Sequence, residues 1–298
     1  MEVFWLEQQA CQDISLVGGK AANLSRLSSQ NRVPPAFCLS ASTEEVEPLI
    51  LSIQKTGRTV TTTNELLSIV KHPYNELCSR IGGEEVGVAV RSSSTEEDSR
   101  EASFAGQYMT FLNVIGIEAV VKAILRCLAS FFSAQAVDYR TRKGLSIKES
   151  RLAVLVQQQV LADVSAVIFS ANPVTGDRGV VVINASWGLG ESVVSGSVTP
   201  DTYIVRKADL NILSRQISEK LLMTVQDTNG TKQVYVPRIM QKEPCIGDEQ
   251  IHEMVQLALT LEKVQGWPVD IECVYQAKKL YLLQCRPITT LDGSEVNS

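Results

Sequence analysis

The chain has 298 residues, which is enough for one large or two medium-sized domains with a substantial core. Apolar residues make up 44% and charged residues 20% of it, as is usual for a soluble globular protein. The net charge of -5 is combined with scattered basic residues and no aromatic-plus-basic stripe, so a nucleic-acid partner is not expected.

The most apolar stretch of helical length, Glu118 to Val137, is interrupted by Lys122 and Arg126, which argues against a membrane span. Its apolar residues recur at helical spacing and predict one amphipathic helix packed on the core. The seven cysteines include no CxxC pair, which is typical of reduced thiols in a cytoplasmic protein. With only two histidines, His72 and His252, no zinc site is expected.

Near the N-terminus, two adjacent glycines precede a lysine in Val17-Gly18-Gly19-Lys20, and Ala21 to Leu27 then reads as a helix. Glycines at a helix start let backbone N–H groups approach an anion, and the lysine adds a positive charge. The segment is not a Walker A loop, because Ile14 stands where the first glycine belongs and Ala21 replaces the Ser or Thr. It fits either a phosphate-binding turn or an ordinary entry into a helix.

A polar segment from Arg91 to Gly106 follows a short strand expected at Glu85 to Val90. It is rich in hydroxyl residues, beginning with Ser92 and Ser93, and has few apolar anchors. Small hydroxyl residues and the glycine can wrap phosphate oxygens, while the planar guanidinium neutralises them. A solvated surface loop is the alternative, although long loops without regular structure tend to be lids or binding loops.

The pattern changes near residue 150, where short apolar runs separated by Gly, Pro and Asn begin to predict strands. These runs are Leu152 to Val156, Ala166 to Phe169, Val180 to Ile183, Tyr203 to Val205, Ile271 to Tyr275 and Leu280 to Leu283. A helix is expected from Ile251 to Gln265, ended by Gly266. Two glycine-containing turns, Asn172 to Gly176 and Trp187 to Ser192, fit ligand binding and a purely structural role equally. The sequence therefore predicts an α+β fold with one lobe at 1–150, a second at 151–291 and a polar tail at 292–298.

The last two strands carry the sharpest candidate site. Val269 to Pro287 reads as a β-hairpin that turns around Ala277 to Lys279. Glu272 and Gln284 would then face each other on one side of the ribbon, with Arg286 on the same side. A carboxylate and an amide oxygen suit Mg²⁺ bridging nucleotide phosphates, and the arginine can face the terminal phosphate. The alternative is the polar outer face of an edge hairpin.

Six segments together resemble the ATP-grasp nucleotide-binding domain of the phosphoenolpyruvate synthase, pyruvate phosphate dikinase and rifampicin phosphotransferase family. Each segment is modest alone, but all six occur in the family's order and span Leu16 to Thr290. They are "LVGGKAANLSRL", "VPPAFCLS", "AVRSSSTEEDSREASFAGQY", "ANPVTGD", "INASWGLGESVVSGSVTPDTYIV" and "VDIECVYQAKKLYLLQCRPIT".

This resemblance implies a two-lobed ATP-grasp fold that binds ATP together with Mg²⁺. It implies that Lys20 and Arg91 hold the nucleotide phosphates and that the loop from Ser92 to Gly106 lies over them. It also implies that Gln157 belongs to a hinge whose backbone reads the adenine edge.

At the other end of the chain, the resemblance implies that Glu272 and Gln284 bind the metal ion and that Arg286 contacts the phosphates. Lys20, Arg91 and Arg286 are the residues expected to take part in catalysis. The whole set of expected nucleotide-binding residues is Lys20, Arg91, Ser92, Ser93, Gly106, Gln157, Glu272, Gln284 and Arg286.

Three features depart from the family pattern. Gln158 and Gln159 replace a basic residue and a methionine, and "AVIFS" at Ala166 to Ser170 replaces the family's "GVxFT". Neither His72 nor His252 lies in a Gly/Thr/Ser-rich phosphohistidine motif. The resemblance therefore implies that the acceptor histidine belongs to a separate swivelling domain or partner protein.

The sequence thus predicts the ATP-binding subunit or domain of a dikinase-like phosphotransferase. The resemblance implies that ATP is cleaved to AMP and phosphate, and that the β-phosphoryl group passes to a histidine and then to a small-molecule acceptor. One alternative is a self-sufficient ATP-grasp ligase or kinase that forms an acyl phosphate and ADP. Another is a nucleotide-binding module without turnover.

Overall fold

The structure is a computed structural model that describes residues 1–56, 60–94, 109–143 and 151–291. It divides into two compact units, of which the first comprises Met1–Gln159 with Thr228–Gly230 and the second comprises Val160–Asp227 with Thr231–Ser298. Each unit combines helices with an antiparallel sheet, which confirms the predicted two-lobed α+β class.

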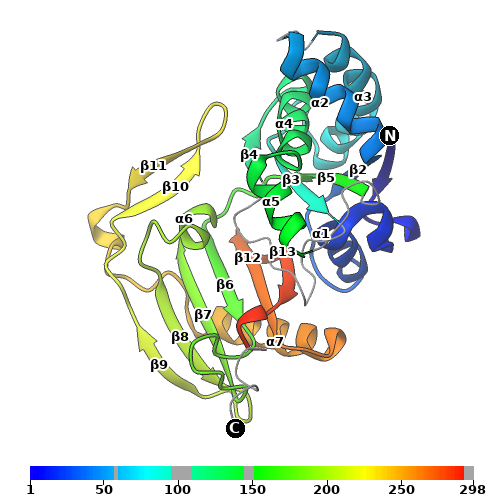
Figure 1. Ribbon diagram of the computed structural model, residues 1–298. Coiled ribbons are helices and arrows are strands. Elements are labelled where there is room, and N and C mark those ends of the chain that lie inside the picture. Colours follow the sequence, from blue (N-terminus) through cyan, green and yellow to red (C-terminus); the bar gives the residue numbers. More distant parts are fainter. Residues whose placement is uncertain (57–59, 95–108, 144–150, 292–298) are drawn as a thin grey trace. The chain divides into compact units, whose positions relative to one another are not determined.

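The first unit is built on a five-stranded sheet in the order β1-β2-β5-β3-β4. Its strands are β1 (Glu2–Trp5), β2 (Ala36–Ser42), β3 (Val88–Ser94), β4 (Thr110–Val114) and β5 (Arg151–Gln158). Its helices are α1 (Ile14–Leu27), α2 (Thr43–Thr56), α3 (Val60–Ile81), α4 (Ile117–Ser130) and α5 (Ala134–Lys143). Helices α2, α3 and α4 cover one face of the sheet and α1 lies on the other (Figure 1).

Strand β5 lies at the centre of this first sheet, between β2 and β3, although its residues begin the lobe predicted at 151–291. The run Leu152 to Val156 is fully buried. A continuous apolar run is what a central strand covered on both faces requires. The strand was therefore expected, but the sheet to which it belongs depends on pairing with distant residues.

The apolar stretch predicted as one helix forms two helices, because Ser133 begins a new one. Helix α4 ends at Ser130, and the Ser133 hydroxyl accepts a hydrogen bond of 3.2 Å from the Ala136 backbone N–H. A serine in this position caps the N-terminus of a helix, which here is α5. The apolar side of α4 packs into the main core, as the spacing predicted.

The second unit is built on a six-stranded sheet in the order β13-β12-β6-β7-β8-β9. Its strands are β6 (Val164–Phe169), β7 (Val180–Trp187), β8 (Asp201–Arg206), β9 (Ile212–Gln216), β12 (Val269–Gln276) and β13 (Lys279–Pro287), with a separate hairpin of β10 (Leu222–Gln226) and β11 (Thr231–Tyr235). Helix α7 (Asp248–Gln265) packs on one face of the large sheet, and α6 (Glu191–Val194) is a single turn (Figure 1). As predicted, α7 stops at Gly266, which has a left-handed φ of 75°.

The β12–β13 hairpin has a two-residue turn at Ala277 and Lys278, whose φ angles are 48° and 64°. Positive φ at both positions is the mark of the tight turns that match the twist of a hairpin. This turn alone would place Glu272 opposite Leu283. A bulge at Leu283 shifts the register by one residue, so that Glu272 pairs with Gln284, as the sequence predicted.

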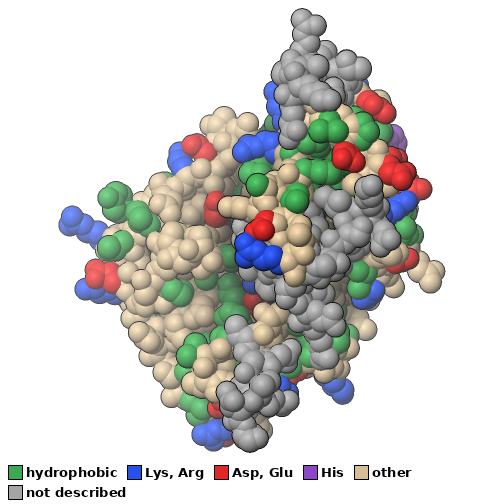
Figure 2. All heavy atoms as spheres, viewed as in Figure 1, with side chains coloured by type: hydrophobic (Ala, Val, Ile, Leu, Met, Phe, Trp, Pro, Cys, Tyr) green, Lys and Arg blue, Asp and Glu red, His purple; other side chains and the backbone are tan. Residues whose placement is uncertain are grey.

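All seven cysteines are buried free thiols. None of the helices in the described part of the chain has the length and apolar character that a membrane crossing needs. On the face shown in Figure 2, acidic and basic side chains of the described residues are scattered, and neither sign forms a dominant patch.

Candidate functional site

Helix α1 contains a break at Gly18, two residues before the predicted phosphate-binding lysine, Lys20. Gly18 has φ 76° and ψ 169°, which are far from helical values. A Cβ atom at Gly18 would lie 2.3 Å from the carbonyl oxygen of Ser93. Only glycine fits this combination of positive φ and close backbone approach. Gly18 is therefore required by the break in the helix and by its contact with the Ser93 backbone.

The side chain of Ser93 fills the gap that this break opens in the helix. In a continuous helix, the Ala21 N–H would bond the Val17 carbonyl. Instead, the Ser93 hydroxyl donates to the Val17 carbonyl at 2.7 Å and accepts from the Ala21 N–H at 3.0 Å. Ser93 was predicted to bind phosphate, but its hydroxyl already makes these two bonds. Its observed contacts make it a brace between β3 and α1.

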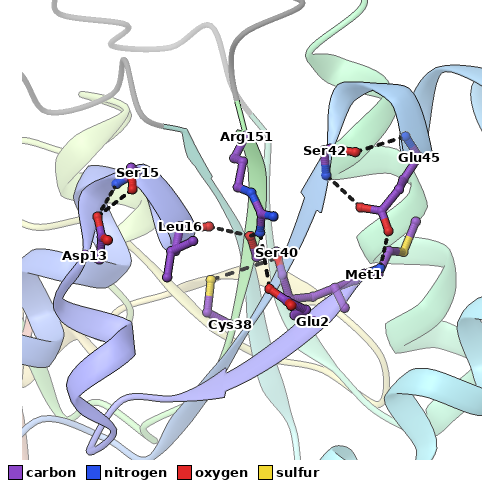
Figure 3. Close-up of polar contacts among 11 residues, drawn as sticks. Met1, Glu2, Asp13, Ser15, Leu16, Cys38, Ser40, Ser42, Glu45 and Arg151 are labelled. Carbon is purple, nitrogen blue, oxygen red and sulfur yellow. Dashed lines mark hydrogen bonds and ion pairs between the residues drawn. The ribbon is translucent and has the colours of Figure 1, made fainter.

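The start of α1 is also attached to strand β2 (Figure 3). The Ser40 hydroxyl donates to the carbonyl of Leu16, and the Cys38 thiol lies 3.8 Å from the Val17 carbonyl. Arg151 donates to the Ser40 hydroxyl at 3.3 Å. These bonds hold the residues before Gly18 against strand β2. Together with the bonds to Ser92 and Ser93 of strand β3, they fix the position of Lys20 over the sheet.

Lys20 and Arg91 lie on the same side of the first sheet. The Lys20 ammonium donates to the Ser92 carbonyl at 3.2 Å. In the β3–β5 register Arg91 pairs with Leu155, and alternation places Arg91 and Gln157 on the α1 face. Gln157 is 1% exposed, and its side-chain N–H lies 3.3 Å from the Pro34 carbonyl. The first sheet thus brings together three of the predicted residues.

One other predicted residue of this unit, Ser92, does not join that group through its side chain. Ser92 lies between Arg91 and Ser93 in the strand, so its side chain points to the opposite face, where its neighbours in the register belong to the apolar core. Within the described residues the Ser92 hydroxyl has no hydrogen-bond partner. Ser92 therefore contributes its carbonyl to Lys20, while its side chain is turned away. Gly106 lies outside the described residues.

The second unit presents the other predicted residues, Glu272, Gln284 and Arg286, on one face of its sheet together with Asp270. We call this face the hairpin face. Arg286 Nε donates to Asp270 Oδ2 at 2.9 Å. Burial raises the pKa of the Asp270 carboxyl above its usual value, and the neighbouring guanidinium partly offsets this effect. The sequence prediction missed Asp270, although its position two residues before Glu272 was a signal that both share a face.

A cavity of about 420 Å³ opens on the hairpin face. Its size is within the range of small-molecule sites in proteins. It combines charged and polar side chains with apolar walls. The lining residues are Val167, Phe169, Asn184, Val193, Val194, Pro200, Thr202, Asp270, Glu272 and Arg286.

The donors on this face fit a magnesium ion that is shared with a phosphate ligand. Among the described residues there is no cluster of three or more His, Cys, Asp or Glu side chains that could enclose a metal ion by themselves. Glu272 and Gln284 are directly paired and both supply hard oxygen atoms. Mg²⁺ is commonly held by one or two carboxylates and completed by substrate phosphates and water.

Comparison with known proteins adds an independent observation. Residues 42–298 match the family described as "Pyruvate phosphate dikinase, AMP/ATP-binding domain". A probable phosphoenolpyruvate synthase from Methanocaldococcus jannaschii is 38% identical over 97% of this chain and 27% of its own length. The phosphoenolpyruvate synthase of Pyrococcus furiosus is 37% identical over 96% of this chain and 44% of its own length.

A rifampicin phosphotransferase from Streptomyces sviceus is 36% identical over 93% of this chain and 35% of its own length. The chain therefore spans less than half of each of these three relatives. Among solved structures, a D-alanine–D-alanine ligase from Helicobacter pylori covers 94% of this chain and 56% of its own, with 9% identity and a TM-score of 0.37. A similarity this low carries no weight for the site.

Proposed function

Because the chain belongs to the pyruvate phosphate dikinase AMP/ATP-binding domain family, we propose that it is the ATP-binding part of a dikinase-like phosphotransferase. In this proposal ATP, water and an acceptor histidine give AMP, phosphate and a phosphohistidine. The histidine lies on a swivelling domain or partner protein and passes its phosphoryl group to a small-molecule acceptor. The three relatives are named as phosphoenolpyruvate synthases or a rifampicin phosphotransferase, and this chain covers only 27%, 44% and 35% of their lengths. This partial coverage supports such a division of labour.

The proposed roles follow from charge and position. Lys20, Arg91 and Arg286 would neutralise the phosphates and hold them in line for transfer. Phosphoryl transfer needs this positioning and charge neutralisation more than covalent help from the protein. Backbone groups near Gln157 would bind the adenine edge. Glu272 and Gln284 would hold Mg²⁺, which when bound supplies further positive charge to the phosphate oxygens.

One observation supports this proposal most directly. The bulge at Leu283 pairs Glu272 with Gln284, and the same face carries Arg286 at the edge of the cavity. Without the bulge, the two strands would pair Glu272 with Leu283 in place of Gln284. Bulges are enriched beside functional sites because they redirect side chains.

Calorimetric titration of the 298-residue chain with ATP and Mg²⁺ tests the proposal. Glu272→Ala should weaken the affinity for MgATP by at least about tenfold, or about 1.4 kcal/mol, because a charged metal ligand is lost. The matched control is Glu243→Ala, an exposed acidic residue outside the cavity, which should bind MgATP as the unaltered chain does. Equal affinity in folded Glu272→Ala, or no binding of MgATP by the unaltered chain, would contradict the proposal.

A further inference from the structure

The cavity reaches beyond the hairpin to strands β7 and β8. Glu272 pairs with Gln284 on one side and with Val167 on the other. Val167 then pairs with Asn184, and Asn184 pairs with Thr202. Directly paired residues point to the same face, so these five side chains form one row across the sheet.

The amide group of Asn184 has a defined orientation. The Thr202 hydroxyl donates to Asn184 Oδ1 at 2.9 Å, and both residues are half-buried in the cavity wall. Within the part of the chain that the structure describes, Asn184 Nδ2 has no hydrogen-bond partner. Two N–H donors are therefore presented at the cavity while the oxygen is already engaged.

The Asn184 amide lies beside apolar side chains of the cavity wall. The neighbouring row on the same face consists of Phe169, Val182 and Ile204 at the corresponding positions of β6, β7 and β8. Val193, Val194 and Pro200 complete an apolar wall. Donors in an apolar setting lose less strength to competition from water, so they favour a ligand that carries acceptor oxygens.

We infer that Asn184 is a phosphate-binding residue, whose side-chain N–H groups donate to polyphosphate oxygens of the nucleotide. The inference rests on the proposed function, because it places this donor beside the metal ion that Glu272 and Gln284 would hold. Asn184 and Glu272 are two strands apart, or about 10 Å between backbones, a span that a metal ion with its phosphates and two side chains can bridge. Because the Thr202 hydroxyl donates to the amide oxygen and fixes the orientation of the amide, the two N–H groups are the part of Asn184 that would meet the phosphates.

The competing explanation is that Asn184 and Thr202 form a cross-strand pair that only stabilises the sheet. Three substitutions separate the two roles. Asn184→Ala removes the N–H donors. Asn184→Asp keeps the shape of the side chain but replaces the N–H donors with a negatively charged carboxylate. Gln216→Ala is the matched control, because Gln216 extends the same row as the partner of Thr202 but is exposed and outside the cavity.

Affinities for MgATP and for AMP are measured by calorimetry, and thermal unfolding is followed without nucleotide. Asn184→Ala should weaken MgATP binding about tenfold, as expected for a lost hydrogen bond to a charged group, and leave AMP binding nearly unchanged. Asn184→Asp should weaken MgATP binding more than Asn184→Ala does, because a carboxylate repels phosphate. Gln216→Ala should bind both nucleotides as the unaltered chain does.

The inference is overturned if Asn184→Asp binds MgATP as tightly as the unaltered chain, or if both substitutions change only the unfolding temperature. Equal losses for AMP and MgATP would also overturn it, since they place the contact elsewhere on the nucleotide. If an Asn184 variant fails to fold, Thr202→Val takes its place as the test. Thr202→Val keeps the shape of the side chain but removes the hydroxyl that orients the Asn184 amide. An unchanged MgATP affinity of Thr202→Val would count against the inference. Normal MgATP binding by Asn184→Ala combined with loss in Glu272→Ala would reject this inference alone, whereas no binding by the unaltered chain would reject the proposed function as well.

Discussion

The contact between Gly18 and Ser93 shows how a single residue positions the lysine of the first unit. The helix break requires glycine for its positive φ, and the Ser93 backbone occupies the space of a Cβ atom. Gly18→Ala should therefore lower the free energy of unfolding by at least about 2 kcal/mol and weaken ATP binding, because Lys20 lies only two residues after the break. Chemical denaturation and nucleotide titration measure the two effects.

Gly176→Ala is the control for that substitution. Gly176 has a φ of 77°, almost the same as Gly18, but nothing lies within 4 Å of the Cβ position. It should cost only the backbone strain of about 1 kcal/mol. If the two alanine variants are equally stable, close packing against Ser93 is not what requires glycine at position 18.

At the same scale, the residue types were predictable but their roles were not. Lys20, Arg91, Glu272, Gln284 and Arg286 could be selected from charge, spacing and resemblance. Ser93 also matched a phosphate-binding pattern, yet its hydroxyl bonds to α1. The difference depends on the packing of a helix against a strand more than 70 positions away in the sequence, which local pattern cannot specify.

Among the secondary-structure elements, the strand β8 that carries Thr202 is anchored by a buried ion pair. Asp201 and Lys220 are fully buried, with Nζ and Oδ1 2.6 Å apart. The Asp201 carboxylate also accepts from the backbone N–H groups of Ser218 and Cys245, both at 2.9 Å. One carboxylate thus connects β8 to two separate loops.

Lys220→Met should lower the free energy of unfolding by about 3 kcal/mol, because it leaves the Asp201 charge buried without its cation. Lys232→Met, which breaks the exposed pair with Asp227, should cost less than about 1 kcal/mol. Urea unfolding of the two variants gives the comparison. Equal decreases in the free energy of unfolding would mean that burial does not explain the stabilisation by the Lys220–Asp201 ion pair.

The β12–β13 hairpin combines a predictable part with an unpredictable one. The strands and the turn follow from alternating residues and their spacing. The bulge at Leu283 does not follow from any residue type in the turn, yet it determines which residue Glu272 faces. The sequence predicted a three-residue turn centred on Lys278, which would place Glu272 opposite Gln284. The actual turn has two residues, and the extra residue at the bulge restores the same pair.

For the whole molecule, the main prediction concerns the product formed from ATP. The chain alone with ATP and Mg²⁺ should yield no AMP, and addition of a partner that carries the acceptor histidine should yield AMP and phosphate. Separation of the nucleotides by ion-exchange chromatography makes the measurement, with a histidine-to-alanine partner as the control. ADP formed by the chain alone would instead support the ligase or kinase alternative, and tight binding without either product would support a non-catalytic module.

Sequence alone was enough to predict the α+β class, most strands after residue 150, helix α7 with its glycine stop, and the family. Those features depend on local periodicity, turn chemistry and motif order, all of which are written along a short stretch of chain. The tertiary structure was needed to place β5 in the first sheet, to turn Ser92 away from Arg91, and to align Asn184 with Glu272. Each of these depends on register between strands that are distant in sequence, and a shift of one residue reverses the face to which every side chain points.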